Sequence, residues 1–313
     1  MPDFVDITNR IDKEHSKKYS LTIAYVGKRS LYAFKNRVED TITFFNNISN
    51  IEIMYVDTSK TELTDIGDVL SKARVIIPNK DISISEAVNT AISLASAPIV
   101  VVMTVNYRIS LLNTKTVRDL FSSEPTLLCI TPTIISQGKR ITETVKISIS
   151  NDILDWIILN NAKNPASLTP NNFLGIYNKN LFNSIGGFIT ETPTNISLIE
   201  FGMRAWSSGC IIISAKDFIL DKIADFEIET NLSEHSTSIP SFKYFFSKKP
   251  LLILLKDLLK IPFYIITFKF KNIFQMFIEI SNYLKNKDKI SLFTPEIEKI
   301  ASIISYYKEE MKS

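Results

Sequence analysis

The chain has 313 residues, of which 45% are hydrophobic and 22% are charged, and its formal net charge is +3. This composition excludes a disordered chain and leaves room for one large domain with a smaller appended unit. No stretch pairs dense Lys and Arg with aromatic residues, so nucleic acid is not an expected partner. The N-terminal residues are charged and lack the apolar core of a secretory signal, which favours a cytoplasmic protein.

Residues 1–19 are predicted to be a polar lead-in, after which strands and helices alternate. The predicted strands of the first half are short and rich in β-branched residues: 20–25, 51–56, 74–77 and 99–103. The predicted helices cover residues 31–47, a segment ending at Leu70, and residues 85–96. This order predicts an α/β fold, a Rossmann-like sheet flanked by helices, with its ligand at the carboxyl ends of the strands.

The second half is less regular. Strands are predicted at 126–130, 144–149 and 153–159. Gly186 and Gly187 predict a tight backbone turn or a close approach of the backbone to a ligand. Cys129 and Cys210, the only cysteines, stand in apolar strand-like sequence. We predict that both are buried free thiols.

The segment 251–280 is rich in Leu, Ile and Phe but contains Pro262 and charged residues that include Lys256, Asp257, Lys260, Lys269 and Lys271. Each central charge costs roughly 2.5–3.5 kcal/mol on insertion into a bilayer, so a spanning helix is not expected. We predict two amphipathic helices that meet near Pro262. Two interpretations stay open. The helices either lie in the headgroup layer on the inner face of the cell membrane, or pack on the rest of the protein or a partner subunit.

The most specific pattern lies in residues 81–107, where Ala87, Asn89 and Ala91 precede an apolar strand and Thr104 and Asn106 follow it. This segment resembles the family-2-type inverting glycosyltransferases, which have a GT-A fold. In that family A-x-N-x-G precedes a strand that ends in the metal-binding D-x-D. Aligned without gaps, the two acids fall on Thr104 and Asn106. The resemblance implies nucleotide-sugar binding by Asn89, Thr104 and Asn106 and a degenerate site for Mn²⁺ or Mg²⁺, so no cofactor is expected.

The resemblance extends over about residues 20–250 and adds two positions on the donor side. Residues 56–62 stand where the family has V-D-D-G-S-T-D, which implies that Asp57 contacts the base of the nucleotide. The alternative for Asp57 is a turn-capping carboxylate bonded to nearby backbone amides. The family's first strand commonly ends in P-x-Y-N, where this chain has Tyr25, Val26, Gly27 and Lys28. By similarity, Tyr25 is a candidate to stack on the base and Lys28 to meet a phosphate.

On the acceptor side, the family places G-G-F before E-D-x-D-L-x-x-R-x-x-x-x-G. The acceptor-side residues that this chain keeps are Gly186, Gly187 and Arg204. Its E-D positions hold Ser197 and Leu198, and Leu198 cannot take a proton. Glu200 occupies the third acidic place and is therefore the candidate catalytic base, with Glu191 as a second candidate.

His235 lies where relatives often have a histidine near the diphosphate, which adds it to the nucleotide-sugar site. Lys248 and Lys249 stand where rhamnosyltransferase-like members have R-N. A histidine and two lysines could neutralise a diphosphate without metal. Two other interpretations stay open: His235 as a histidine of a surface loop, and the two lysines as the basic start of a membrane-facing helix.

Two functions follow from the resemblance. The first is a divergent, metal-independent glycosyltransferase that moves a sugar from a nucleotide donor to a glycan or lipid-linked acceptor. The second is a catalytically inactive pseudo-glycosyltransferase that binds a nucleotide, a glycan or a partner glycosyltransferase, because acids are lost at two separate sites. The expected domains are a GT-A domain at 20–245, with halves of about 20–110 and 111–245, and a C-terminal helical segment at 246–313.

Overall fold

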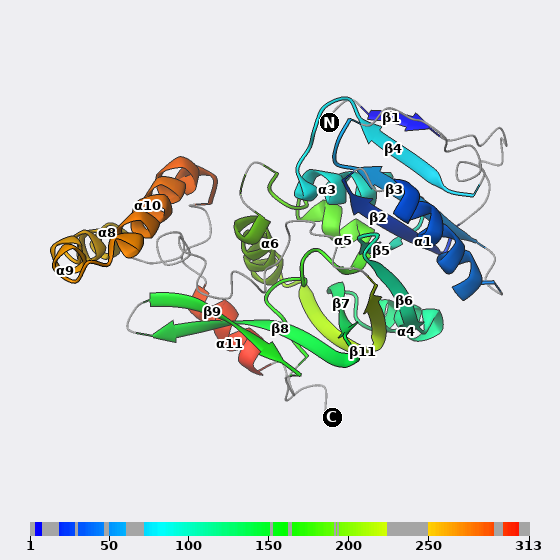
Figure 1. Cartoon of the computed structure of the whole chain (residues 1–313). Coiled ribbons are helices and arrows are strands. Elements are labelled where there is room, and N and C mark those ends of the chain that lie inside the picture. The colour runs from blue at the N-terminus through cyan, green and yellow to red at the C-terminus, as the bar shows by residue number, and fades with distance from the viewer. Residues whose placement is uncertain are drawn as a thin grey trace. The chain divides into compact units, whose positions relative to one another are not determined.

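The protein divides into two compact units, residues 1–144 with 160–230 and residues 145–159 with 231–313 (Figure 1). A computed structural model describes the following residues: 4–7, 19–28, 31–46, 50–60, 72–150, 153–161, 165–190, 192, 194–223, 250–290 and 297–306. The sequence-based domain boundaries stay a prediction.

A mixed sheet forms the centre of the first unit. Its strands are β1 (Phe4–Ile7), β2 (Leu21–Gly27), β3 (Ile51–Asp57), β4 (Arg74–Pro78), β5 (Ile99–Met103), β6 (Tyr107–Leu112), β7 (Leu127–Ser136), β10 (Gly175–Asn178) and β11 (Ile211–Lys222). Their order across the sheet is β1-β4-β3-β2-β5-β10-β7-β11-β6. Strands β4, β3, β2 and β5 are parallel, and β10 lies antiparallel between β5 and β7. The predicted α/β class is confirmed.

Helices cover both faces of this sheet. They are α1 (Leu31–Phe44), α3 (Ile84–Leu94), α4 (Thr114–Ser123), α5 (Lys179–Ser184) and α6 (Thr194–Ser207). On one face, the Phe34 ring of α1 lies 5.7 Å from Tyr25 and 4.8 Å from Tyr55. The strand register puts Ile176 on the face of Tyr25 and Tyr177 on the opposite face, because side chains alternate along a strand. Tyr177 contacts Phe182 of α5 at 5.6 Å, so α5 covers that second face.

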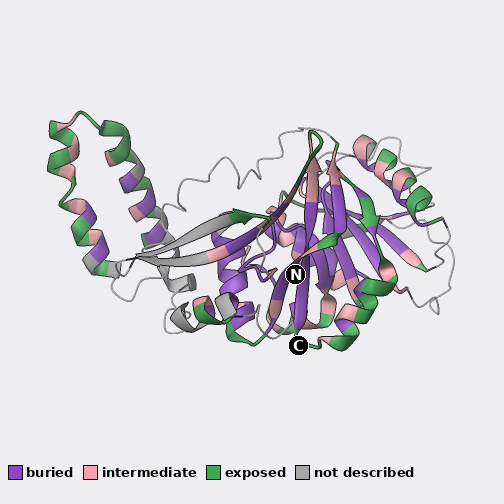
Figure 2. Cartoon of the chain, turned by 90° about the horizontal axis from the view of Figure 1, so that it is seen from below, coloured by how far each residue is buried: buried purple, intermediate pink, exposed green. Residues whose placement is uncertain are grey.

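The burial pattern explains why α3 and β5 follow each other so closely. Ser83 caps α3 by accepting a hydrogen bond from the Glu86 backbone N–H, and the helix buries an apolar face that includes Ala87 and Ala91. Strand β5 has no charged residue and is buried along almost its whole length, as expected for the centre of a parallel sheet (Figure 2).

The predicted strands and helices of the first half are confirmed wherever the structure describes them, and both cysteines are buried free thiols. The helix predicted to end at Leu70 lies outside the described residues. One prediction is wrong. The polar lead-in contains the strand β1, whose short Phe4–Ile7 segment pairs antiparallel with β4 at the sheet edge. Only four residues take part in that strand, too few for a periodic pattern in the sequence.

The second unit contains β9 (Ile153–Asn160) except its last residue, the second half of β8 (Lys139–Ser150), and four helices. The helices are α8 (Pro250–Leu258), α9 (Ile261–Ile266), α10 (Phe270–Ile290) and α11 (Ile297–Tyr306). Where the sequence predicts two helices that meet near Pro262, the structure has three helices, α8, α9 and α10. Pro262 stands in the first turn of α9, where its missing N–H costs no helical hydrogen bond. Within the described residues, no helix is long and apolar enough to cross a membrane.

Candidate functional site

The carboxyl ends of β2, β3 and β5 form the candidate site, which we name the carboxyl edge and define by Gly27, Asp57 and Thr104. Gly27 pairs with Asp57 across β2 and β3, and Tyr25 pairs with Met103 across β2 and β5. The chain steps outward from β2 to β3 and β4, then returns to the other side of β2 as β5. Open α/β sheets bind ligands outside the carboxyl ends of strands at such a switch point.

Thr104 and Asn106 lie in the turn that leaves β5 at this edge. The Tyr107 N–H donates to the Thr104 carbonyl at 3.1 Å, and the Ile223 N–H donates to the Asn106 carbonyl at 2.8 Å. Both side chains are only 7% exposed. Thr104 Oγ1 is buried and has no hydrogen-bond partner among the described residues. Buried hydroxyls without partners are rare, so this hydroxyl marks a place where a ligand group or water would bind.

The donor-side candidate Asp57 caps a turn. Its Oδ1 accepts hydrogen bonds from the Ser59 backbone N–H at 3.0 Å and from Ser59 Oγ at 3.1 Å. This is the alternative that the sequence left open for Asp57, and it places the carboxylate firmly at the end of β3. A contact with a nucleotide base stays a prediction.

Tyr25 lies in the core beneath the carboxyl edge. Its ring is 1% exposed, packs against Phe34, and its hydroxyl bonds to Thr41 Oγ1 at 2.7 Å. Burial raises the pKa of Tyr25 to about 12, only partly offset by the hydrogen bond with Thr41. Stacking on a base would require this ring to leave its packing. The structure therefore gives Tyr25 a role in packing, and Lys28, exposed in the bend after β2, is the donor-side neighbour that reaches solvent.

Exposed lysines follow three neighbouring parallel strands. Lys28 comes after β2, Lys60 after β3 and Lys80 after β4, and all three are exposed. Adjacent strands lie about 4.8 Å apart, so the three loops start within roughly 10 Å of one another. Sequence reasoning missed Lys60 and Lys80 because isolated lysines carry no pattern until the strand order is known. Together they offer positive charge where a diphosphate would lie.

The residues at the carboxyl edge do not fit a divalent metal ion. Thr104 and Asn106 offer neutral oxygens, whereas Mg²⁺ and Mn²⁺ sites normally include carboxylates. Asp57 already holds the Ser59 turn. Across the part of the chain that the structure describes, no three His, Cys, Asp or Glu side chains form a group that could hold a metal. We therefore derive no chemical step through a metal, and metal independence stays a prediction.

Behind the sheet, Asn89 fixes the backbone of the glycine turn. Its Nδ2 donates to the Phe188 carbonyl at 2.7 Å, and its Oδ1 accepts from the Phe188 N–H at 2.8 Å. Gly187 has φ +68°, and a Cβ there would lie 2.7 Å from Asn89 Oδ1. The predicted turn at Gly186 and Gly187 is thus present, and Asn89 reaches it from α3.

Arg204 holds the other side of the same turn. It donates to Glu200 Oε1 at 2.8 Å and to Oε2 at 2.6 Å, and also to the carbonyls of Gly187, at 2.7 Å, and Ile185. We name this group the turn cluster and define it by five residues: Asn89, Gly186, Gly187, Glu200 and Arg204. Glu200 is 1% exposed, and both of its carboxylate oxygens accept hydrogen bonds from Arg204. These contacts give Glu200 a structural role in the turn. Its role as catalytic base stays a prediction.

The family's E-D positions lie beside this cluster at the start of α6. Ser197 Oγ donates to the Ile189 carbonyl at 2.7 Å and accepts from Ser85 Oγ at 3.3 Å, which ties α6 to the first turn of α3. Leu198 is fully buried. The candidates Glu191, His235, Lys248 and Lys249 lie outside the described residues.

Glu143 is a carboxyl group that sequence reasoning missed. It directly follows the residues of β8 that pair with β7, and its Oε2 accepts a hydrogen bond from Asn171 Nδ2 at 2.6 Å. Burial raises the pKa of Glu143, and the hydrogen bond from Asn171 lowers it in part. In the sequence it alternates with Thr142 and Thr144, the pattern of an ordinary solvent-facing acid on a strand. Only the hydrogen bond with the buried Asn171 distinguishes Glu143 from such an acid.

The turn that holds Asn171 is strained and stands at the carboxyl edge. Gly175 pairs with Val102, so the residues just before β10 lie beside the end of β5. Asn172 and Phe173 have φ of 47° and 65°, a left-handed conformation that a phenylalanine rarely adopts. The Tyr177 hydroxyl supports it by donating to the Phe173 carbonyl at 2.8 Å. Strained backbone of this kind clusters at functional sites.

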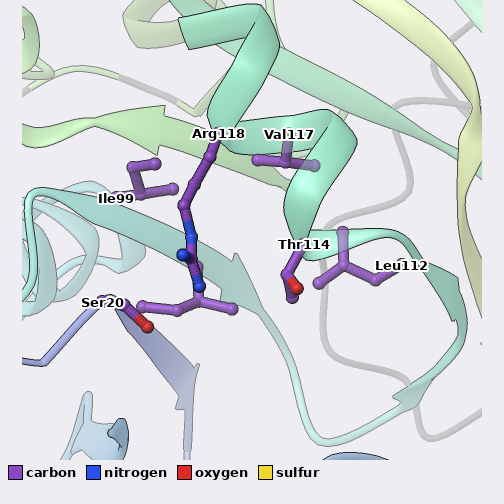
Figure 3. Close-up of a pocket in the computed structure, with 7 residues that line it drawn as sticks. Ser20, Ile99, Leu112, Thr114, Val117 and Arg118 are labelled. Atoms are coloured by element: carbon purple, nitrogen blue, oxygen red, sulfur yellow. The ribbon is translucent and has the colours of Figure 1, made fainter. Parts of the chain in front are cut away.

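A small hollow on the opposite edge of the sheet does not fit a nucleotide sugar. Ser20 precedes β2 and Ile99 begins β5, so the hollow lies at the amino ends of these strands (Figure 3). Arg118 of α4 reaches across it. Its cavity volume is about 10 Å³, room for about one water molecule.

Neither a protein-family model nor a curated protein sequence matches the chain. Solved structures do match. A structure of GalNAc-T7 with UDP, GalNAc and Mn²⁺ has a TM-score of 0.51 at 12% identity, covering 67% of this chain and 44% of that chain. The fold is of the GT-A type.

Two further matches have TM-scores below 0.5. TarS from S. aureus has a TM-score of 0.46 at 13% identity, over 66% of this chain and 37% of that one. The mannosyltransferase PcManGT from Pyrobaculum calidifontis, with GDP-Man and Mn²⁺, has a TM-score of 0.48 at 12% identity, over 95% and 83%. The chain spans less than half the length of TarS and GalNAc-T7. The fold assignment rests on the GalNAc-T7 match, and the family-2 and rhamnosyltransferase-like assignment stays a prediction.

Proposed function

We propose that this GT-A protein binds a nucleotide sugar at its carboxyl edge and transfers the sugar to a glycan or lipid-linked acceptor without a metal ion. The observation that carries the proposal is the buried hydroxyl of Thr104, which lacks a partner among the described residues at the switch point between β2 and β5. Asp57 and Asn106 flank it, and Lys28, Lys60 and Lys80 supply charge for the diphosphate. GalNAc-T7, which shares the fold, is described with UDP bound.

For the acceptor hydroxyl we favour Glu143 as the base. A base must lose its proton to work, and a carboxyl group whose pKa is raised towards neutrality is better matched to that task than an ordinary one. Glu143 has one oxygen on Asn171 and is partly open to solvent. Glu200 has both oxygens on Arg204 and is buried. Replacement of each acid by glutamine, with release of nucleoside diphosphate as the readout, separates the two.

A second function is a pseudo-glycosyltransferase that binds the same donor, or a partner glycosyltransferase, without turnover. The observation that favours it is the Glu200–Arg204 pair, because the acid nearest the family's catalytic position is occupied in holding the glycine turn. If the protein is inactive, it still binds the nucleotide sugar. The slow hydrolysis of the donor is then the same for wild type and for every variant of Glu143 or Glu200.

The test is a calorimetric titration with UDP, GDP and dTDP sugars in EDTA, on wild type and two matched variants. Thr104→Val removes the hydroxyl at the carboxyl edge, and Thr169→Val removes another buried hydroxyl without a partner in the described chain. One lost hydrogen bond to the ligand weakens binding by up to about tenfold. We expect that loss for Thr104→Val and none for Thr169→Val. Absence of binding to every nucleotide sugar would overturn the proposal.

If binding is found, transfer decides between the two functions. Release of nucleoside diphosphate is measured with a lipid-linked glycan extract as acceptor, for wild type, Glu143→Gln and Glu200→Gln. Loss of a general base typically costs about 10²- to 10⁴-fold in rate. A drop of this size for Glu143→Gln alone supports the transferase with Glu143 as base. The same drop for Glu200→Gln alone, with the folded state intact, restores the prediction made from sequence.

A further inference from the structure

The helices α8, α9 and α10 expose an unusual amount of apolar surface. Of the eighteen large hydrophobic side chains that are exposed in the described residues, twelve lie between Leu251 and Leu284. Figure 2 shows these helices with exposed residues along most of their length. Soluble proteins rarely leave contiguous apolar patches of this extent uncovered, and large ones mark contact with a partner or a membrane.

On α8 and α10 many apolar side chains are exposed while two acids are buried. Leu251 and Leu255 of α8, and Leu259 directly after it, follow one another at intervals of four and are 54–75% exposed, whereas Asp257 is 4% exposed. On α10, Phe270 and Phe274 are exposed and Glu279 is buried. The buried Asp257 accepts a hydrogen bond from Lys260 Nζ at 2.6 Å. The two carboxylates thus share the inner side with Ile253, Met276 and Tyr283, while many leucine and phenylalanine side chains face outward, where water does not favour them.

The apolar surface continues without a break through α9. No residue of this helix is buried, and Phe263, Ile266 and Phe268 are 58%, 75% and 81% exposed. Exposed lysines stand on both sides of this stretch: Lys256 and Lys260 before it, and Lys269 and Lys271 after it. We name residues 251–284 the apolar hairpin, with α9 at its tip.

The charges of the apolar hairpin indicate which kind of partner binds to it. Between residues 251 and 284 its only acids are Asp257 and Glu279, both buried. Lys260 is paired with Asp257, which leaves Lys256, Lys269 and Lys271 as the exposed lysines outside that pair. A second copy of the chain would bring lysines against lysines, and like charges across an interface are unfavourable. A surface rich in anionic lipid headgroups is complementary to the same lysines, each worth about 1 kcal/mol near such a surface.

We propose that the apolar hairpin lies in the headgroup layer of an anionic membrane. Phenylalanine, leucine and isoleucine side chains of its outer face enter the boundary of the acyl chains, while the lysine stems extend along that face and their ammonium groups reach the lipid phosphates. This interaction goes beyond the proposed transferase activity and does not depend on it, since no residue of the carboxyl edge takes part.

The test is flotation of the full chain with vesicles of phosphatidylcholine, alone or mixed with phosphatidylglycerol. The first variant, Ile266→Asp with Phe268→Asp, changes the tip. The control, Leu111→Asp, changes an exposed leucine of β6 in the first unit. Burying one such side chain is worth about 1.5–3 kcal/mol, so the tip variant should lose tenfold or more in vesicle affinity for each side chain. The control should float like wild type.

A charge variant separates lipid from protein partners. Lys269→Glu with Lys271→Glu should weaken binding to the anionic vesicles, leave any weak binding to phosphatidylcholine alone unchanged, and reduce the dependence on salt. Three results would overturn the proposal: no flotation of wild type, equal flotation of the tip variant, or dimers in solution that the tip variant abolishes. Nucleotide-sugar titration of the same variants should match wild type, so failure here and failure of the proposed function are distinguishable.

Discussion

The turn cluster and the carboxyl edge lie in the same unit and both carry positions that match the glycosyltransferase pattern, yet they differ in how those positions are used. In the turn cluster, Asn89 and Arg204 each bind backbone carbonyls of the Gly186–Phe188 turn at about 2.7 Å. At the carboxyl edge, by contrast, the buried Thr104 hydroxyl has no partner among the described residues.

The difference separates what the fold requires from what the chemistry requires. The side chains of Asn89 and Arg204 hold the backbone that joins α5 to α6, so a change there would disturb the glycine turn. At the places where the resemblance expects acids that meet metal or acceptor, the chain has Thr104, Asn106, Ser197 and Leu198. A motif residue that survives is therefore weak support for catalysis unless its contacts are with ligand rather than with backbone.

The largest effect should come from breaking the ion pair of the turn cluster. Arg204→Met removes the partner of a carboxylate that is 1% exposed, together with hydrogen bonds to two carbonyls. Removing one partner of a buried pair costs about 3–5 kcal/mol, because the remaining charge is buried without compensation. Urea unfolding should show this loss.

The double variant Arg204→Met with Glu200→Met is the control for that experiment. It removes the uncompensated charge, so we expect it to recover part of the lost free energy of unfolding. A double variant as unstable as Arg204→Met alone would mean that the carbonyl contacts, not the ion pair, hold the turn.

A smaller loss is expected from adding one methyl group to the turn. Gly187→Ala meets two penalties, a positive φ of 68° and a Cβ 2.7 Å from Asn89 Oδ1. The left-handed conformation alone costs roughly 1–2 kcal/mol, and displacing Asn89 adds the loss of its hydrogen bonds with Phe188.

Gly138 supplies a matched control for Gly187. It has a similar φ of 74° but no atom within 4 Å of an added Cβ. Gly138→Ala should therefore show the conformational cost only, roughly 1–2 kcal/mol in urea unfolding. If both variants lose the same free energy of unfolding, the contact between Gly187 and Asn89 is not close-packed in solution.

The same comparison explains what the sequence could reveal. The strands 51–56 and 99–103 follow from short β-branched runs and the helix 85–96 from its apolar spacing, since local pattern and burial agree there. The glycine turn follows from Gly186 and Gly187 alone. The strand β1 has four residues and pairs with a strand about seventy residues away, so no local pattern reports it.

Candidate site residues were harder to assign, because a residue type does not say what the side chain contacts. Asn89 and Arg204 were expected to serve the ligand sites, and the structure shows their contacts with the turn backbone. Glu143 carries no motif, and its burial depends on Asn171, which is 28 positions away. Lys28, Lys60 and Lys80 come together only through the strand order of the sheet.

The smallest effect we predict is a change in pH dependence at the carboxyl edge. Burial raises the pKa of Glu143 in the folded protein above the unfolded value of about 4.5, so the folded state keeps this proton where the unfolded chain has lost it. The stability that this group contributes is therefore complete below pH 4.5 and is lost as pH rises through the folded pKa. Glu143→Gln keeps an oxygen that can accept from Asn171 but has no proton to lose.

Urea midpoints measured between pH 4.5 and 8 should thus rise for Glu143→Gln relative to wild type as pH increases, with the smallest difference at the acid end. Tyr25 and the glycine turn are unchanged in this variant, so their contribution cancels in the comparison. A difference that stays constant over the whole range would show that Glu143 titrates alike in the folded and unfolded states. It would then be an ordinary surface acid, and the proposed role of Glu143 as the base would lose its support.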